Sequence, residues 1–550
     1  MRLTSVAVGL ATAVSLAAQG TFTEWTIPTA NTQPHCVVAD SRGRIWYAGA
    51  GSHKVGVLDP ATGVIREFTP PTPNSHPHGI AVDGGDTVWF TEIDGNRIGR
   101  IDPATFQITE YPLPNPGSGP HTPIWDGRDA IWFTEQRGNR IGRLNIRTGA
   151  IEEFAIPTPN SGPYGIVADA AGNAWFCSFG GGSNRIGRVD ARTGEVKEFG
   201  TPTANSGPRR PWMDSSGRIW ITENRANRIA VFDPATERFT EWMSPTPNGQ
   251  PYGVVVDRDD AVWYNEFNTN FLVRFDPRTE RFTRYPFPTP RVILRIVAVD
   301  PANRIWYGGN ASNRIGVIDP RTSAVSAASF RATESNSGIA PGALVTIFGD
   351  GFAGETEVAG ALPLPYSLGG VAVEAGGRAA PLHYVSPRQL SALIPFETAP
   401  GPAWLRVTRG SMIVSQMVEV LAAAPGVFAV NQQGTGAGLI VHGADFRLVA
   451  ESAPAQPGEF IAILVTGLGR TEPSFASGAL PPSPPPETIA RPEVRIAGLP
   501  ALVTFSGAAP FAPGVYQINV QVPASAPSGT QSVEVTVNGV MSNVVTMAVR

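Results

Sequence analysis

A regular ladder of tryptophans constrains what this chain can fold into more than any other feature. Consecutive members are 43 residues apart, except for one step of 45 residues, and the seven are Trp46, Trp89, Trp132, Trp175, Trp220, Trp263 and Trp306. Self-similarity at this period indicates one supersecondary unit that is copied and stacked. Seven such copies are typical of a closed seven-bladed β-propeller, in which each blade is a four-stranded antiparallel sheet.

Each repeat has the sequence signals of four short strands. In residues 77–114, alternating runs are separated by turn-forming Gly, Asn, Asp and Pro, and no window has sustained helical periodicity. The tryptophan lies in the second strand, where we interpret it as a structural residue that packs between blades. Residues 22–28 resemble an outermost strand but precede the first repeat, so we expect them to complete the seventh blade. The propeller is therefore predicted over residues 22–322.

Composition and charge limit the class of protein. The 60 Gly and 52 Pro residues are regularly spaced, which indicates turn-rich β structure rather than disorder. A net charge of −4 without a basic run gives no electrostatic support for nucleic-acid binding. Residues 1–18 have the pattern of a cleaved signal peptide, the alternatives being a buried first strand or an uncleaved anchor. We expect a secreted, periplasmic or cell-surface protein, with no other segment able to span a membrane.

The two cysteines lie in different repeats, Cys36 in the first and Cys177 in the fourth. Nonadjacent blades seldom bring two positions within bridging distance. We therefore expect two buried free thiols, in preference to a disulfide or to metal ligation.

Two sets of polar residues run in phase with the tryptophans. The first, at the start of each innermost strand, comprises His35, His78, His121, Tyr164, Arg209, Tyr252 and Arg295. The second, three residues after each tryptophan, comprises Gly49, Glu92, Glu135, Ser178, Glu223, Glu266 and Gly309. We expect both near one mouth of the central channel, where converging polar groups predict a site. Arg209 and Arg295 would either neutralise the carboxylates or bind a substrate carboxylate.

Repeats two and three carry a histidine followed 14 residues later by a glutamate, namely His78 with Glu92 and His121 with Glu135. An imidazole can act as a general base near neutral pH. Carboxylates beside imidazoles also suit a hard ion such as Mg²⁺, which could stabilise a developing enolate or oxyanion. The alternative interpretation is a hydrogen-bonded rim that holds the innermost strands together.

Several blade phrases resemble the streptogramin B lyases (virginiamycin B lyase), among them PHGIAVD, VWFTEIDGNRIGRID and PHTPIWDGRDAIWFTEQRGNRIGRLN. The resemblance covers residues 22–320 and implies a seven-bladed propeller. It also implies Mg²⁺-dependent elimination that opens a cyclic depsipeptide. In that reaction a histidine removes a proton, and metal-binding glutamates stabilise the enolate. The implied cofactor is Mg²⁺, and the implied ligand is a small cyclic peptide or ester.

The resemblance assigns roles in either of two registers. In the first register, His78 contacts the substrate, His121 is the base and Glu135 binds the metal. The family's other metal-binding glutamate falls on Gly119 in this register.

The second register lies one blade earlier. His35 contacts the substrate, His78 is the base and Glu92 binds the metal, with His76 where the other glutamate would stand. The two registers together make the candidate bases His121 and His78, the candidate metal ligands Glu135 and Glu92, and the candidate substrate-binding residues His35, Arg209, Tyr252 and Arg295.

The repeat stops after residue 320, and an internal duplication follows. IAPGALVTIFG echoes AQPGEFIAILVTG, and QLSALIP echoes QINVQVP. Short alternating runs between turn signals predict two immunoglobulin-like β-sandwich modules, 324–423 and 424–550. Motifs such as LPLPYSLGGVAV and GVYQINVQVPAS resemble a C-terminal domain of unknown function in exported proteins of soil Acidobacteria, including Solibacter.

Two functions stay open at this point. The first is an exported lyase that opens a cyclic depsipeptide or related ester. The second is a noncatalytic exported propeller that binds a carbohydrate, a peptide or a cell-surface partner. For either function we expect a monomer without a nucleic-acid partner. The discriminating observation is whether the histidines and the glutamates at 92 and 135 point to one place with room for an ion.

Overall fold

The computed structural model describes residues 20–181, 184–320, 325–326, 338–349, 351–431 and 434–550, and the predicted signal peptide lies outside them. These described residues form strands and turns without any helix, which confirms the all-β prediction. They make two compact units, which are described separately. One unit contains Ile27–Pro320, and the other contains Gly20–Thr26 and Arg321–Arg550.

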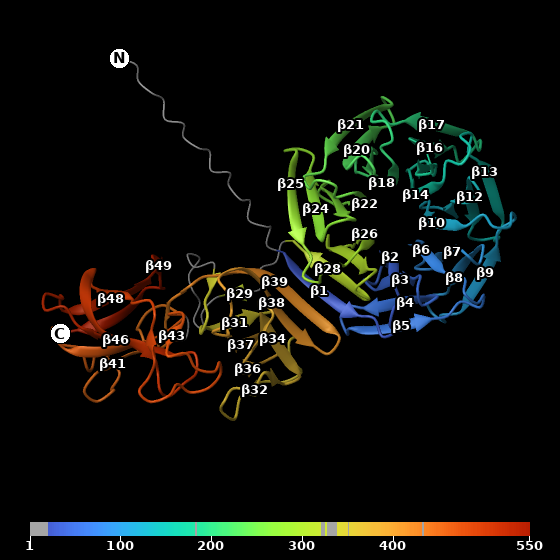
Figure 1. Cartoon of the computed structure of the whole chain (residues 1–550). Coiled ribbons are helices and arrows are strands. Elements are labelled where there is room, and N and C mark those ends of the chain that lie inside the picture. Colours follow the sequence, from blue (N-terminus) through green and yellow to red (C-terminus); the bar gives the residue numbers. More distant parts are fainter. Residues whose placement is uncertain (1–19, 182–183, 321–324, 327–337, 350, 432–433) are drawn as a thin grey trace, which may run out of the picture. The chain divides into compact units, whose positions relative to one another are not determined.

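The first unit consists of one antiparallel sheet for each sequence repeat (Figure 1). From the innermost strand outward, the first three blades are β2 (Pro34–Ala39), β3 (Ile45–Gly49), β4 (Lys54–Asp59), β5 (Val64–Phe68); β6 (Pro77–Val82), β7 (Val88–Glu92), β8 (Arg97–Ile101), β9 (Ile108–Pro112); and β10 (Pro120–Trp125), β11 (Ala130–Glu135), β12 (Arg140–Asn145), β13 (Ile151–Ala155). The next three are β14 (Pro163–Ala168), β15 (Ala174–Ser178), β16 (Arg185–Val189), β17 (Val196–Gly200); β18 (Pro208–Met213), β19 (Ile219–Glu223), β20 (Arg228–Asp233), β21 (Arg238–Met243); and β22 (Pro251–Val256), β23 (Val262–Glu266), β24 (Phe271–Asp276), β25 (Arg281–Pro286). The seventh repeat contributes β26 (Leu294–Val299), β27 (Ile305–Gly309) and β28 (Arg314–Asp319).

The blades close into a ring around their innermost strands. Each innermost strand contacts the innermost strands of both neighbouring blades, and β26 returns to contact β2. Figure 1 shows these strands at the centre, with the later strands of each blade outside them. The predicted seven-bladed propeller is therefore confirmed.

The tryptophan ladder packs between blades, as predicted. No indole of the ladder is more than 3 % exposed, and Trp46 shares a buried cluster with Ile80 and Phe90 of the next blade. In six blades the indole N–H donates to the aspartate six residues earlier, at 2.8–3.0 Å. In the third blade Trp132 donates instead to the carbonyl of Gly172, at 3.1 Å. This hydrogen bond satisfies the one polar atom of each large buried ring.

Each innermost strand leaves regular pairing near its beginning. In β10 the register with β11 shifts between Pro120 and Pro123, and the other six innermost strands have an equivalent shift. His121 and Thr122 lie within this irregular stretch. Such a bulge re-aims side chains relative to a regular strand, so it decides which residues reach the channel.

The N-terminal segment is divided between the two units. In the first unit, the N–H of Ile27 donates to the carbonyl of Asn313 at 3.0 Å, and the amide of Asn313 donates to the carbonyls of Ile27 and Thr29 at 3.1 and 3.0 Å. The seventh blade is thus tied to the beginning of the chain, as ring closure requires. In the second unit, β1 (Thr21–Thr26) pairs antiparallel with β39 (Met412–Val420). The sequence analysis did not predict this second pairing.

The second unit begins with a two-sheet sandwich. One sheet has the order β29 (Val325–Ser326), β31 (Leu344–Phe348), β37 (Gln389–Leu393), β36 (Leu382–Val385) and β32 (Glu357–Val358). The other has the order β39, β38 (Gly401–Arg409), β34 (Val371–Ala375) and β33 (Ser367–Leu368), with β30 (Gly338–Ile339) on β39 and β35 (Arg378–Ala380) on β34. Side chains of both sheets, such as Val345 and Leu405, form one buried cluster.

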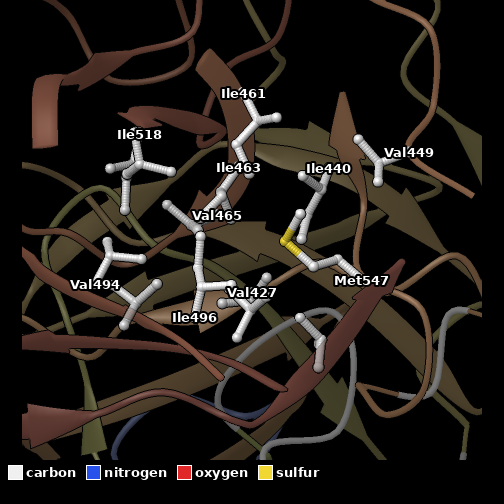
Figure 2. Close-up of a cluster of buried hydrophobic side chains, with 14 of the residues drawn as sticks. Val427, Ile440, Val449, Ile461, Ile463, Val465, Val494, Ile496, Ile518 and Met547 are labelled. Atoms are coloured by element: carbon white, nitrogen blue, oxygen red, sulfur yellow. The ribbon is translucent and has the colours of Figure 1, made fainter. Parts of the chain in front are cut away.

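A second sandwich follows. Its first layer contains β42 (Phe460–Thr466), β47 (Tyr516–Gln521) and the second half of β46 (Leu499–Ala508). The first half of β46 pairs with β45 (Glu493–Ile496), which joins β48 (Gly529–Val537) and β50 (Val545–Val549) in the second layer. Figure 2 shows the apolar core, including Val427, Ile440, Val449, Ile461, Ile463, Val465, Val494, Ile496, Ile518 and Met547. The immunoglobulin-like strand order stays a prediction.

The two sandwiches share an interface around residues 423 and 424. Ala423 belongs to the second core, and Ala424 belongs to the first. Phe396 of the first sandwich also packs in the second core. Its N–H donates to the hydroxyl of Ser477 at 3.0 Å, and its carbonyl accepts a hydrogen bond from Nε of Arg470 at 3.0 Å. This shared packing explains why both sandwiches form one compact unit.

Two smaller predictions concern the cysteines and the membrane. Cys36 and Cys177 are buried free thiols, as expected, and burial raises the pKa of Cys36 to about 11. Over the described ranges, no helix has the length and apolar character needed to cross a membrane.

Candidate functional site

The first polar set converges at the centre of the ring. The ring centroids of His35 and His78 lie 3.6 Å apart, those of His78 and His121 lie 4.1 Å apart, and those of His121 and Tyr164 lie 4.0 Å apart. Four successive blades thus place one ring each in a continuous row, in which neighbouring rings are tilted by 37–49°. The histidines are at most 7 % exposed, and the Nδ1–H of His78 donates to the carbonyl of His121 at 3.2 Å.

The remaining members of this set come from the other three blades. Tyr252 is fully buried, and its hydroxyl is hydrogen-bonded to that of Tyr164. The guanidinium carbon of Arg209 lies 3.8 Å from the ring centroid of Tyr252, and Nη2 of Arg209 donates to the Tyr164 hydroxyl at 3.0 Å. The guanidinium carbon of Arg295 lies 5.4 Å from the Tyr252 ring centroid. The structure therefore brings together all the predicted catalytic and substrate-binding residues.

One member of the site was missed by the sequence analysis. Arg210 is 5 % exposed, its guanidinium carbon lies 4.9 Å from the Tyr164 ring centroid, and its Nη1 donates to the hydroxyl of Thr122 at 2.6 Å. Thr122 also shares a hydrogen bond of 2.8 Å with Nδ1 of His121. A signal was present, because none of the other six repeats carries a charged residue at the position of Arg210, and three of them carry glycine. We call the assembled set the channel cluster, defined as His35, His78, His121, Tyr164, Arg209, Arg210, Tyr252 and Arg295.

Electrostatics keep the imidazoles of the channel cluster neutral. Burial and the charge of Arg210 lower the pKa of His78 to about 3. Burial, followed by the charges of His78 and Arg210, holds the pKa values of His35 and His121 well below the ordinary value. At neutral pH the three rings therefore add hydrogen-bonding groups without adding charge.

The two phenols respond differently to the same surroundings. Burial, with the charge of Tyr252 adding to it, raises the pKa of Tyr164. Burial acts upward on Tyr252 as well, but the charges of Arg209, Arg210 and Arg295 outweigh it, and the pKa of Tyr252 is lowered. The arginine charges therefore outweigh burial at Tyr252 but not at Tyr164.

The glutamates of the second set do not join the channel cluster. Oε2 of Glu135 lies 3.0 Å from where a Cβ on Gly138 would sit, beneath the turn that follows its own strand. Burial raises the pKa of Glu135 to about 7, and the charge of Glu153 in the same blade adds to the shift, while Ser118 opposes it.

Glu92 has the same kind of surroundings one blade earlier. Burial raises its pKa to about 7, and the nearby charge of Glu110 adds to the shift. In the fifth blade, burial and then the charge of Glu241 raise the pKa of Glu223 to about 8. The charge of a second carboxylate in the same blade thus acts on each of these three carboxyls, which we call the paired glutamates.

Glu266 in the sixth blade differs from the paired glutamates. It accepts hydrogen bonds from the hydroxyls of Ser244 and Thr269, at 2.9 and 2.8 Å. Its carboxylate is thus held by hydroxyl donors from the turn after β23 and from the segment that follows β21 of the fifth blade.

The residues that the structure gathers do not suit Mg²⁺. This ion prefers oxygen ligands, chiefly carboxylates, carbonyls and water, whereas the channel cluster offers imidazoles, phenols and guanidiniums. Within the described ranges no group of three or more His, Cys, Asp or Glu side chains could hold a metal ion. The magnesium ion implied by the family resemblance stays a prediction, and we assign it no ligands.

A separate hollow of about 630 Å³ opens between loops of the third and fourth blades, at the other end of β10 from His121. It is lined by Asp126, Arg128, Asp129, Arg143, Arg147, Ala171, Gly172, Asn173, Asp190, Ala191 and Arg192. Arg128 donates to the carbonyl of Ala170 at 2.7 Å across this hollow. None of the predicted site residues lines it.

Comparisons with known proteins agree with the propeller geometry. The sequence profile of the Virginiamycin B lyase family matches residues 4–230 and 86–344. Virginiamycin B lyase from Staphylococcus aureus aligns with 28 % identity and a TM-score of 0.51, over 54 % of this chain and 98 % of that one. A second crystal structure, of a catalytically inactive variant of that enzyme with quinupristin, gives the same values. A streptogramin B lyase aligns with 27 % identity and a TM-score of 0.51, over 55 % of this chain and 98 % of that one. No curated protein sequence matches the chain.

Proposed function

Because the chain belongs to the virginiamycin B lyase family, we propose that its propeller is an exported domain that binds a peptide, carbohydrate or cell-surface ligand through the channel cluster. The observation that carries the proposal is the convergence of predicted ladder residues from all seven blades. Structural positions of a repeat are uniform, whereas these positions differ in charge and shape from blade to blade. Export rests on the sequence of residues 1–18.

Hydrogen bonds within the channel cluster hold His121 in position. Nη1 of Arg210 donates to Oγ1 of Thr122, which leaves the hydroxyl proton available for Nδ1 of His121. In this arrangement Oγ1 of Thr122 keeps a second lone pair that can accept from Nδ1 of His121, so the imidazole can carry its proton on either ring nitrogen. The neutral ring can therefore present either a hydrogen-bond donor or an acceptor to a ligand.

The test is an array screen of neutral and anionic glycans and peptides with the full chain. Wild-type protein should retain a ligand class, and His78→Ala should weaken that binding by at least about tenfold, as expected for a lost buried hydrogen-bonding group. Arg238→Gln, at an exposed position on β21, is the control and should bind like wild type. Binding that His78→Ala leaves unchanged, or no binding at all, would overturn the proposal.

Lyase activity is the second candidate, favoured by family membership and by a row of adjacent histidines with neutral rings. In such a reaction a base removes a proton next to a carbonyl and the carbon–oxygen bond breaks. The ring opens with a new double bond and no added water. Quinupristin, the compound in one of the related crystal structures, is the probe.

We expect quinupristin to be recovered intact after incubation, with or without millimolar Mg²⁺. A ring-opened isomer of unchanged mass would establish the lyase instead, provided that His121→Ala lowers its formation by about 10²–10⁴-fold. In that case Glu135→Gln should also be compared with and without Mg²⁺. A product heavier by one water would indicate hydrolysis and would exclude both the elimination and the noncatalytic proposal.

A further inference from the structure

Arg210 is a buried cation whose hydrogen bonds are largely unmade. Nη1 is satisfied by Thr122, but Nε and Nη2 have no hydrogen-bond partner among the described residues. A buried charge is costly unless it is paired and hydrogen-bonded. A buried guanidinium at this position therefore requires a hydrogen-bond acceptor that the described protein residues do not supply.

The sequence repeat shows that Arg210 departs from the blade pattern. The equivalent residues of the other blades are Cys36, Gly79, Thr122, Gly165, Gly253 and Ile296. At Gly165 the absence of a side chain allows the blades to pack closely. A Cβ at this position would lie 2.7 Å from the carbonyl oxygen of Arg209 in the next blade. Propeller assembly does not require arginine at this position, so we look for another role for it.

Two more guanidiniums lie on the same side of the channel cluster. Arg209 approaches both tyrosines, with its guanidinium carbon 4.6 Å from the Tyr164 ring centroid and 3.8 Å from that of Tyr252. Nε of Arg209 and Nε of Arg295 also lack hydrogen-bond partners within the described part of the chain. Three like charges therefore gather around two tyrosine rings.

No carboxylate of the described residues neutralises these three arginines. The four glutamates expected to do so have other surroundings. Those at positions 92, 135 and 223 experience the charge of a second carboxylate in their own blades, and Glu266 accepts hydrogen bonds from Ser244 and Thr269. The neighbouring imidazoles are neutral, since burial and Arg210 lower the pKa of His78. Of the two alternatives raised by the sequence, neutralisation of blade carboxylates is thus disfavoured, and recognition of an anionic ligand is left.

We propose that the ligand of the channel cluster carries a compact oxyanion, a carboxylate, sulfate or phosphate group, which Arg210 binds together with Arg209 and Arg295. This inference rests on the proposed binding function and names the chemical class of its ligand. The planar guanidinium presents paired N–H donors that match two oxygens of such a group. The rings of Tyr164 and Tyr252 hold the guanidiniums in place by cation–π contact.

The experiment uses the full chain and three simple probes, namely sodium acetate, sulfate and phosphate, at constant ionic strength set with sodium chloride. Thermal unfolding followed by tryptophan fluorescence and isothermal titration calorimetry report binding. We expect saturable binding of at least one probe, and the strongest of the three identifies the group. Arg210→Gln should weaken that binding by at least about tenfold, and Arg210→Lys should restore part of it.

A structural role of Arg210 would not produce the same pattern. Without oxyanion, Arg210→Gln should unfold at the same temperature as wild type or above it, because an uncompensated charge is removed. With saturating oxyanion the order should reverse. Arg238→Gln, which removes an exposed charge, should follow wild type throughout. If Arg210→Gln does not fold, Arg209→Gln replaces it in the binding assay, with the same expected loss.

Equal binding by wild type and the arginine variants, or no saturable binding of any probe, would overturn the oxyanion inference. The array screen separates this failure from that of the proposed function. Neutral ligands retained through His78 without any oxyanion binding would leave the binding function standing. No retained ligand of any charge would remove both.

Discussion

The propeller has two polar ladders, one that begins each innermost strand and one that follows each ladder tryptophan by three residues. In repeats two and three the members of the two ladders are 14 residues apart in sequence, yet they lie in different surroundings in the fold. Members of the first ladder, such as His78 and His121, meet at the centre of the ring with centroids 4.1 Å apart. Members of the second ladder, such as Glu92 and Glu135, lie beside a second carboxylate in their own blade. The constant spacing of 14 residues between histidine and glutamate therefore does not place the two side chains in one site.

The two ladders also differ in how their titration affects the stability of the propeller. Burial lowers the pKa of His78 to about 3 and raises that of Glu92 to about 7, so in the folded protein His78 is neutral at pH 7 and Glu92 is protonated below pH 7. The histidines then reduce stability on the acid side, where the unfolded chain takes up protons. The paired glutamates reduce it on the alkaline side, where the unfolded chain has released them. Each ladder should govern one side of the pH–stability curve.

The largest expected effect concerns the three paired glutamates. Their pKa values are raised to about 7 for Glu92, 7 for Glu135 and 8 for Glu223, against an ordinary 4.5. Their stabilisation is complete below pH 4.5 and is lost as pH rises through 7 to 8. Between pH 6.5 and 9 the propeller should lose on the order of 3 kcal/mol.

The measurement is the unfolding temperature by tryptophan fluorescence across this pH range. A triple variant, Glu92→Gln, Glu135→Gln and Glu223→Gln, should lose little stability over the same range, since an amide resembles the protonated carboxyl. If the variant declines as steeply as wild type, the paired carboxyls do not control the alkaline side.

A smaller effect is expected from His78 on the acid side. Its pKa is depressed from 6.5 to about 3 by burial and by Arg210, so its contribution is present above pH 6.5 and is lost as pH falls. Between pH 6.5 and 5 this contribution amounts to about 1.5 kcal/mol. His78→Asn, whose amide can still donate to the His121 carbonyl, should therefore show a shallower acid decline than wild type. Parallel curves for the two proteins would contradict the burial of a neutral imidazole here.

The smallest effect is expected at Glu266, a member of the same ladder without a partner carboxylate. Where the second, third and fifth blades carry Glu110, Glu153 and Glu241, the sixth carries Arg284. Glu266→Gln should cost about 1 kcal/mol or less, for weakened hydrogen bonds from Ser244 and Thr269. The alkaline decline should keep the slope of wild type. If Glu266→Gln reduced the alkaline loss of stability as much as the triple variant does, the position in the ladder would set the pH response, and a second carboxylate in the blade would not be needed.

Most of the propeller could be predicted from the sequence because structurally equivalent residues recur at a constant spacing in every repeat. Trp46 and its six counterparts mark the second strand, and the aspartate six residues before each one is equally regular. Position within the repeat therefore identified the seven blades and the start of every innermost strand. The pairing of β1 with β39 had no such signal, because strand pairing between distant segments leaves no local pattern.

The candidate site was predicted in part. Six of the eight proposed residues, the three histidines with Arg209, Tyr252 and Arg295, do converge, because they share one repeat position on strands that surround one axis. Glu92 and Glu135 do not, since their strand directs them beneath the following turn. Arg210 was overlooked because a residue that departs from the repeat pattern can be interpreted only when the residues around it in the folded protein are known.

The sequence by itself determined the period, the number of blades and the positions allowed to vary, since those follow from local pattern and composition. Only the tertiary structure decided which varied positions meet. The bulge in each innermost strand turns His121 and its counterparts toward the centre, and the close backbone approach of Gly165 to Arg209 and Arg210 is possible only without a side chain at position 165. Burial then sets the charge of each group, and burial is a property of the assembled ring rather than of any one repeat.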